Sequence, residues 1–256
     1  MKVNSKNIEL NDEIKRLLKQ FKLPDIYDKY DEEIQYAVDK NIGHREFLYK
    51  LFKAEEQGKN ERLKIKNIKN ACFDGHKVIE RFDFNFPDSI NQRKILDLST
   101  LDFMDKKENI VFIGPPGVGK SHLSIAIGMK ACESGKSVLF VNAIDLIDDL
   151  YNSIELGTLK QRFKKLDKVD LLIIDDIGYL KMNKEKESIF FQLIRQRYEK
   201  NSLIVTTNLP FDRWEDIFTS ELAATAVLDR LLHHSHVISI TGDSYRVNRI
   251  FEEDIH

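Results

Sequence analysis

The spacing of hydrophobic residues changes near residue 109, which divides the chain into two kinds of sequence. Before this point, apolar residues recur at intervals of three and four, the spacing of one helical face. The clearest examples are Ile14–Phe21 and Phe47–Phe52. Pro24 follows the first of these stretches and is expected to end that helix or to begin another one. The N-terminal part of the chain is therefore predicted to be helical.

Beyond residue 109, short apolar runs rich in β-branched residues alternate with longer amphipathic stretches. Nearly unbroken runs of this length are typical of strands that are buried on both faces. The runs are Ile110–Ile113, Val138–Val141, Leu171–Ile174, Leu203–Val205 and His236–Ile240. Helical spacing occurs between them, for example over residues 121–134 and 184–200. This alternation predicts an α/β fold in which a parallel five-stranded sheet is flanked by helices.

Between the two kinds of sequence, Phe82–Pro87 alternates apolar and polar residues and ends in proline. This pattern indicates an extended linker. We predict a small helical domain over residues 1–81 and a larger core domain over residues 82–256. A chain of 256 residues is long enough for this division into two domains.

Composition narrows the classes of function. The 40 basic and 42 acidic residues leave a net charge of −2, which excludes nucleic-acid binding by bulk charge but permits a local basic patch. No apolar stretch is long enough to span a membrane, and the polar N-terminus lacks the apolar region of a signal peptide. The two cysteines, Cys72 and Cys132, have no metal-ligand spacing. We expect a cytoplasmic protein without a membrane partner.

The strongest motif is Gly114–Ser121, which satisfies the pattern G-x-x-x-x-G-K-[ST] between a predicted strand and a predicted helix. Glycines let backbone N–H groups surround phosphate oxygens, and the helix N-terminus adds its dipole. Lys120 is expected to reach the β- and γ-phosphates of ATP, and the Ser121 hydroxyl to bind Mg²⁺. The alternative is a glycine turn before an ordinary helix. The predicted nucleotide-binding residues are Gly114, Pro115, Pro116, Gly117, Val118, Gly119, Lys120, Ser121 and His122.

Two further strands end in polar residues that suit phosphate chemistry. Asp175 and Asp176 follow a buried run, and we assign Asp175 to Mg²⁺ and Asp176 to polarising the attacking water. Asn208 follows the next strand and is a candidate for orienting that water, because strand ends face the ligand crevice of an α/β sheet. The alternatives are carboxylates that cap a loop and an asparagine in a turn before Pro210.

The segment Asp229–His236 combines one arginine with three histidines. Arg230 is a candidate for stabilising transition-state charge from across a subunit contact, and its alternative is a surface ion pair. The spacing of His233, His234 and His236 converges poorly on a metal, and no acidic or cysteine residue adjoins them in the sequence. A polar turn before the last strand is therefore favoured over a metal site.

The order Lys120, Asp175, Asn208, Arg230 resembles the Walker A, Walker B, sensor 1 and arginine finger of AAA+ ATPases. More closely, the chain resembles the IstB-like transposition helper ATPases of bacterial insertion sequences. The stretches that carry this likeness are Arg45–Leu48, Phe82–Phe84, Gly114–Ser121, Leu172–Leu180, Val205–Phe211, Ala224–Val237 and Gly242–Arg246. The resemblance implies an AAA+ core with a small helical N-terminal domain. It also implies ATP-driven self-assembly around DNA that presents a target site to a transposase.

The chain departs from the AAA+ pattern in two places. Asp176 stands where many AAA+ proteins have Glu, and its shorter side chain is expected to alter the activation of water. Only 14 residues follow Gly242, too few for the helical lid that many AAA+ proteins carry. We therefore expect neither a C-terminal lid nor a lid-borne sensor 2, a role in which Arg246 could substitute.

Binding of duplex DNA would require a concentrated basic patch, because the whole chain is almost neutral. The resemblance points to the segment between the second and third predicted strands. Its basic residues are Lys160, Arg162, Lys164 and Lys165. Other candidates are Lys59–Lys69, with a net charge of +4, and the group Lys181, Lys184 and Lys186. For each of them the alternative is a solvated helix face. No base-reading motif is found, so backbone contacts are expected.

These features together predict an ATPase that hydrolyses ATP to ADP and phosphate with Mg²⁺, in a site completed between subunits. Its expected partners are duplex DNA, a transposase and further copies of itself. Two alternatives stay open. One is a replicative helicase loader of the DnaC or DnaI type, whose N-terminal domain would grip a helicase. The other is a metabolic P-loop kinase, which would need an acceptor pocket and would show no stimulation by DNA.

Overall fold

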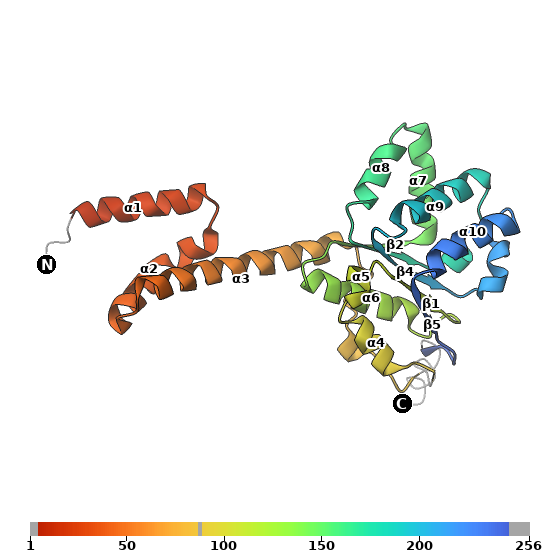
Figure 1. Cartoon of the computed structure of the whole chain (residues 1–256), viewed down its shortest axis with the longest axis horizontal. Helices are drawn as coiled ribbons and strands as arrows, with labels where there is room; N and C mark the ends of the chain where they lie inside the picture. The colour runs from red at the N-terminus through yellow and green to blue at the C-terminus, as the bar shows by residue number, and fades with distance from the viewer. Residues whose placement is uncertain (1–4, 87–88, 246–256) are drawn as a thin grey trace, which may run out of the picture. The chain divides into compact units, whose positions relative to one another are not determined.

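The computed structural model describes residues 5–86 and 89–245 and divides into two compact units, Met1–Ile65 and Lys66–His256 (Figure 1). This division falls earlier in the chain than the predicted boundary after residue 81. The reason is that the residues after Ile65 pack on the larger unit: Asn67 Nδ2 donates to the carbonyl oxygen of Lys136 over 2.9 Å, and the Ala71 carbonyl accepts from Phe140 N over 2.8 Å. Independent folding of residues 1–81 stays a prediction.

The first unit is helical, as predicted. It contains α1 (Ser5–Gln20), α2 (Pro24–Lys40) and the first part of α3 (His44–Asn70). Proline is tolerated at the start of α2 because it lacks an N–H there. The buried Glu55 carboxylate of α3 accepts from the N–H groups of Asp25 and Ile26 over 2.9 and 3.1 Å, which caps α2. A small core fills the unit: Ile26, Tyr30 and Leu51, with Ile14, Leu18, Leu23 and Phe47 against them.

The second unit contains the predicted five-stranded sheet. Its strands are β1 (Asn109–Ile113), β2 (Val138–Asn142), β3 (Leu171–Asp175), β4 (Ser202–Thr207) and β5 (Ser235–Ser239). Every pairing among them is parallel, and the order is β2-β3-β4-β1-β5. The carboxyl ends of β1, β3 and β4 therefore meet at one edge of the sheet.

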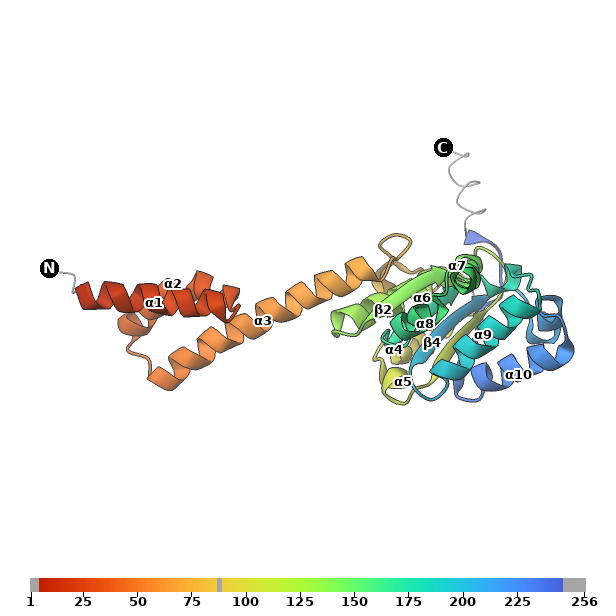
Figure 2. The ribbon, with the colours of Figure 1, turned by 90° about the horizontal axis from the view of Figure 1, so that it is seen from above.

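Helices cover both faces of this sheet (Figures 1 and 2). On one face lie α4 (Gln92–Leu98), α5 (Asp102–Asp105) and α6 (Lys120–Glu133). On the other lie α7 (Ala143–Glu155), α8 (Leu159–Leu166), α9 (Lys184–Arg197) and α10 (Glu221–Leu232). Each face of the sheet has its own hydrophobic core, and side chains that alternate along β1 contribute to both. Ile110 and Phe112 point to the first face and Val111 to the second. Short 3₁₀ turns, η1 (Ile79–Arg81), η2 (Ile177–Tyr179) and η3 (Phe211–Asp216), connect these elements.

The segment predicted as an extended linker is built into the core unit. Phe82 and Phe84 pack against the α4–α6 face, with ring centroids 5.0 Å apart in an edge-on arrangement. The alternation of aromatic and polar residues therefore reflects packing of one side of the segment, because the aromatic side chains cover apolar surface that would otherwise face water.

Two further expectations concern membrane-spanning helices and a C-terminal lid. Within residues 5–86 and 89–245, every helix is too short or too polar to pass through a lipid bilayer. Arg246 and the rest of the segment relevant to a C-terminal lid lie outside the described residues.

Candidate nucleotide-binding site

The loop between β1 and α6 has a backbone that requires glycine. Gly117 and Gly119 have φ values of 85° and 96°, in the left-handed region. A Cβ atom on Gly114 would collide with the carbonyl oxygen of Ile240, the residue after β5. The Gly114 N–H also donates to Thr207 O over 3.1 Å, which ties the loop to the end of β4. The loop therefore closes tightly over the N-terminus of α6, where helical N–H groups can meet an anion.

Lys120 lies inside this loop. The residue is 5% exposed, and its Nζ lies 2.8 Å from the carbonyl oxygens of both Gly114 and Pro115. The ammonium group is thereby held at the mouth of the loop, where a phosphate would meet it. Ser121 follows in the first turn of α6 and lines the same space.

A pocket of about 400 Å³ opens in front of the loop. It brings together most of the predicted site: residues 116–122 from the loop and α6, Asp176 from the end of β3, and Asn208 from the end of β4. Gly114 and Pro115 contribute their carbonyl oxygens to Lys120 without lining the pocket. The parallel register explains this convergence, because neighbouring strands end at the same edge.

The two aspartates take different positions. Asp175 is the last residue of β3 and is buried, and Thr206 Oγ1 donates to its Oδ1 over 2.6 Å. Asp176 has a φ of 61°, so the chain turns there and the residue reaches the pocket wall. Its N–H donates to the same Thr206 hydroxyl over 2.8 Å. Thr206 thus connects both aspartates to β4.

Sequence reasoning missed Thr206, although a usable signal was present. Val205-Thr206-Thr207 places two hydroxyls in a strand whose every residue is buried. Buried hydroxyls need partners, so such a pair indicates a hydrogen-bonding task.

Asn208 presents a buried acceptor to the pocket. Its Oδ1 is shielded from solvent and has no hydrogen-bond partner within the part of the chain that the structure describes. A Cβ on Gly178 would collide with this oxygen, so the asparagine rests against the glycine. An unsatisfied buried acceptor costs about 1–3 kcal/mol. A water or ligand in the pocket would satisfy it, which is compatible with the predicted orienting role.

The donor set fits the expected ligands. Ser121 lines the pocket, whereas Asp175 is buried at the end of β3 and does not line it. Both side chains carry the hard oxygen ligands that suit Mg²⁺. Lys120 and the N–H groups of the loop suit phosphate oxygens. The roles of the individual residues stay predictions.

An aromatic wall on the other side of the pocket was not predicted. Phe82 lies edge-on to His122, with centroids 5.3 Å apart, and Phe86 lies edge-on to Tyr245 at 5.4 Å. The Tyr245 N–H donates to Gly117 O over 3.2 Å, which places Tyr245 against the loop. Aromatic rings that line a pocket can pack against a base. The signal in the sequence is the alternation of phenylalanines, a pattern that by itself predicts a linker.

Arg230 does not line this pocket. It lies half-buried on α10, where Nη1 donates to Ala226 O over 2.8 Å and the guanidinium carbon lies 4.8 Å from the centre of the Phe191 ring of α9. The structure therefore places Arg230 on the α9–α10 side of its own subunit rather than beside the loop.

The predicted basic patch lies on α8. Its four cations are all exposed, while Phe163 and Leu166 on the opposite side of the helix are buried in the core. Arg162 pairs with Asp149 over 2.6 Å, which leaves Lys160, Lys164 and Lys165 as the outward charges of this surface, hereafter the α8 patch. The other basic candidates are partly neutralised: Arg62 pairs with Asp25 and Glu55, and Lys186 pairs with Asp148.

The C-terminal end of α8 is anchored from α9. The buried Arg197 donates to the carbonyl oxygens of Leu166, Val169 and Ser202 over 2.8–3.0 Å. Burial lowers the pKa of Arg197 to about 10, partly opposed by nearby aspartates, so the guanidinium stays charged at neutral pH. The α8 patch therefore rests on a fixed support.

Solved structures of other proteins share this fold. DnaI matches with a TM-score of 0.56 and 22% identity over 65% of this chain and 92% of its own. The DnaC helicase loader matches with a TM-score of 0.52 and 21% identity, covering 68% and 99%. AMPPCP-bound DnaA from Aquifex aeolicus gives 0.57 and 21%, covering 71% and 55%. At 21–22% identity these likenesses show that the chain shares the fold of DnaI, DnaC and DnaA.

Sequence comparison then identifies the family. The family described as IstB-like ATP binding protein matches residues 16–252, and the chain belongs to it. An insertion sequence IS21 protein of Pseudomonas aeruginosa, named for ATP binding, is 39% identical over 92% of this chain and 89% of its own. The corresponding IS5376 protein of Geobacillus stearothermophilus is 40% identical over 90% and 93%. The resemblance to IstB-like proteins is thereby confirmed.

Proposed function

We propose that this protein is an ATPase that assembles on duplex DNA in its ATP-bound state and helps a transposase to engage target DNA. The observation that carries the proposal is one pocket containing the phosphate-binding loop, Asp176 and Asn208, with Arg230 outside it. Relatives covering about nine-tenths of the chain are named for insertion sequences, which supports a role in transposition.

Within the pocket, the chain's residues divide the work of phosphoryl transfer to water. ATP with Mg²⁺ supplies the scissile γ-phosphate and a neutralising cation. Lys120 and the loop N–H groups bind the phosphates, and Ser121 and Asp175 hold the cation. Asp176 accepts a proton from water, and Asn208 orients that water. Thr206 supports this geometry because it holds the backbone of Asp176 and the carboxylate of Asp175.

Self-association completes the site in this proposal. Arg230 is absent from the pocket of its own subunit, and it lies on a helix at the outside of the core. A neighbouring subunit that packs its pocket against the end of α10 would receive this guanidinium near the γ-phosphate. Dilute protein is therefore expected to hydrolyse ATP slowly.

The α8 patch is the proposed DNA-binding surface. Exposed lysines on one side of a helix, with a packed hydrophobic side behind them, form a surface that can contact successive phosphates. Such contacts carry no base information, so weak sequence preference is expected.

A helicase loader is the competing function. The structural similarity to DnaI and DnaC shows only the fold at 21–22% identity, whereas the insertion-sequence relatives reach 39–40%. A metabolic kinase has no support among these relatives. Binding assays with purified transposase and purified replicative helicase separate the first two functions, because only the proposed role requires the transposase.

The decisive experiment is negative-stain microscopy of the full chain with duplex DNA, in ATP and in ADP. We expect rings or spirals on DNA in ATP and dispersed particles in ADP. Lys120→Ala should give dispersed particles in both nucleotides. Particles that stay single and unattached to DNA in either nucleotide would contradict the proposal.

A further inference from the structure

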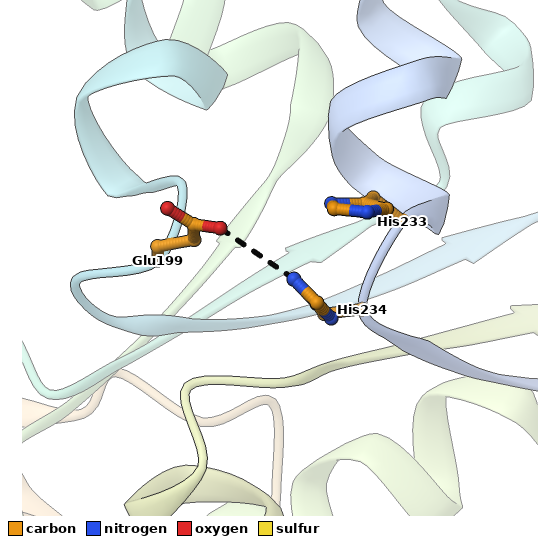
Figure 3. A group of neighbouring side chains, drawn as sticks. All are labelled: Glu199, His233 and His234. Carbon is orange, nitrogen blue, oxygen red and sulfur yellow. Dashed lines mark ion pairs between the residues drawn. The ribbon is translucent and has the colours of Figure 1, made fainter.

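A cluster of metal-ligating side chains lies at the C-terminal ends of α9 and α10, away from the pocket. It contains Glu199, His233 and His234, which Figure 3 shows converging from two segments. One ligand atom of each residue lies within 4.8 Å of the others, and Glu199 Oε1 is 3.5 Å from His234 Nε2. All three side chains are exposed.

The fold separates the three histidines of this segment into a neighbouring pair and a third that lies elsewhere. His233 and His234 do form a turn before β5, as predicted, but His236 points elsewhere and its Nε2 lies 2.8 Å from Glu108. The acidic partner missing from the local sequence is supplied by Glu199, which is distant in the sequence. The three histidines therefore do not converge, as their spacing predicts, but His233 and His234 gain an acidic neighbour that the local sequence does not show.

A neighbouring side chain already orients one of the three residues, and the backbone turns at another. The Tyr198 hydroxyl lies 2.5 Å from His233 Nδ1, which leaves Nε2 of that ring to act as a ligand. A metal-bound histidine is commonly held in this way through its other ring nitrogen. Glu199 has a φ of 58°, which is uncommon for a residue other than glycine, and the chain turns there as it leaves α9.

We propose that Glu199, His233 and His234 bind a divalent transition metal, with Zn²⁺ as the best fit. Two imidazole nitrogens and one carboxylate oxygen are a common set of three protein ligands for zinc, with water in the fourth position. Zinc–nitrogen bonds of about 2.0–2.1 Å imply ligand atoms roughly 3.3 Å apart in a tetrahedral site. The exposed side chains reach this spacing by small rotations. The site is separate from the oxygen donors assigned to Mg²⁺, a harder cation.

The site has a structural consequence for α10. Arg230 lies three residues before His233 and rests on Phe191 of α9. A metal bound to Glu199 and to both histidines joins the segment after α9 to the end of α10. Metal binding therefore restrains the helix pair from which Arg230 extends.

The test is a Zn²⁺ titration of the full chain, purified without a polyhistidine tag, in excess Mg²⁺ so that oxygen sites are filled. The wild-type chain is expected to bind one Zn²⁺ that His234→Ala loses, and Glu199→Gln should weaken that site at least tenfold. His76→Ala removes an exposed histidine outside the cluster and serves as the matched control. It should bind as the wild type does.

A second readout makes the result independent of stoichiometry. Co²⁺ in the wild-type site should give visible absorption typical of low coordination, which His233→Ala and His234→Ala should abolish while circular dichroism stays unchanged. Equal Zn²⁺ binding in the wild type, Glu199→Gln and His234→Ala would overturn the proposal. None of these measurements depends on ATP hydrolysis, so they stand or fall separately from the proposed function.

Discussion

The candidate nucleotide pocket and the two helices α8 and α10 all carry cations to which we assign functions, but the pocket holds its cation differently from the helices. Lys120 is buried and hydrogen-bonded to two carbonyl oxygens of its own loop. Lys164 and Lys165 are exposed, and Arg230 rests on a neighbouring helix outside the pocket. The pocket is organised within one chain, whereas the outer cations would gain a defined geometry only against another molecule. The following predictions test this difference.

Arg230→Ala is expected to have the largest effect. If the guanidinium acts in a neighbouring subunit, its loss should lower ATP turnover by about 10³-fold, the smaller end of the range for arginine fingers. ATP affinity measured by fluorescence titration should stay within about twofold, because Arg230 does not line the pocket of its own subunit.

Arg195→Ala is the matched control for this prediction, because Arg195 is an exposed arginine on α9. It should leave both quantities unchanged. A loss of ATP affinity in Arg230→Ala would show that Arg230 supports the pocket of its own subunit. The claim that it acts only against another molecule would then be wrong.

Lys120→Ala should act on binding itself. Hydrogen bonds to a charged group contribute about 1.5–3 kcal/mol, so ATP affinity should fall about 10- to 100-fold. Calorimetric titration measures this directly. Lys130→Ala, on the same helix but ion-paired at the surface with Glu80, should bind ATP normally. Unchanged affinity in Lys120→Ala would contradict the assigned role of the loop.

The double variant Lys164→Glu, Lys165→Glu tests the α8 patch. Each lysine that contacts a phosphate contributes about one unit to the slope of log affinity against log salt, so the slope should fall by about two. Affinity for duplex DNA should fall about tenfold at moderate salt, while ATP affinity stays unchanged. Lys106→Glu, Lys107→Glu reverses an exposed pair elsewhere in the core unit and should leave the slope intact. An unaltered slope in the α8 variant would exclude this patch.

The sequence predicted the five strands, the phosphate-binding loop and the residues that follow β3 and β4. These features depend on local composition and on one general rule, that parallel strands end at the same edge. The positions of the loop glycines and of Lys120 could be predicted for the same reason, since they depend on one short segment.

Contacts between distant segments could not be predicted in the same way. The sequence around Phe82 predicts a linker because its neighbours His122 and Gly119 come close only after folding. Glu199 meets His233 and His234 only because α9 and α10 end together. Each of these pairings depends on helix packing, which no single segment encodes.

The hydrogen bonds of Thr206 to Asp175 and Asp176 depend directly on the register between β3 and β4. Its substitution should have the smallest effect on activity of the variants considered. Thr206→Val keeps the shape of the side chain but removes the hydroxyl that serves Asp175 and Asp176. Leaving buried polar groups without a partner should lower the free energy of unfolding by about 1–3 kcal/mol. Turnover should fall about tenfold at unchanged ATP affinity, because a shift of the aspartates costs the transition state about 1.4 kcal/mol.

Thr207→Val is the matched control, since Thr207 is the next residue of β4 and its hydroxyl interacts with the backbone of Leu209 instead. Urea denaturation should show a similar loss of stability in both variants, and steady-state kinetics should show the loss of turnover in Thr206→Val alone. Thr206→Ser retains the hydroxyl and should restore turnover. Equal loss of turnover in both valine variants would mean that general loosening of β4, rather than the link to the aspartates, limits the reaction. In that case β4 as a whole, rather than Thr206, would hold the pocket residues in position. The pocket would then differ from the exposed cations of α8 and α10 only in how deeply its residues are buried.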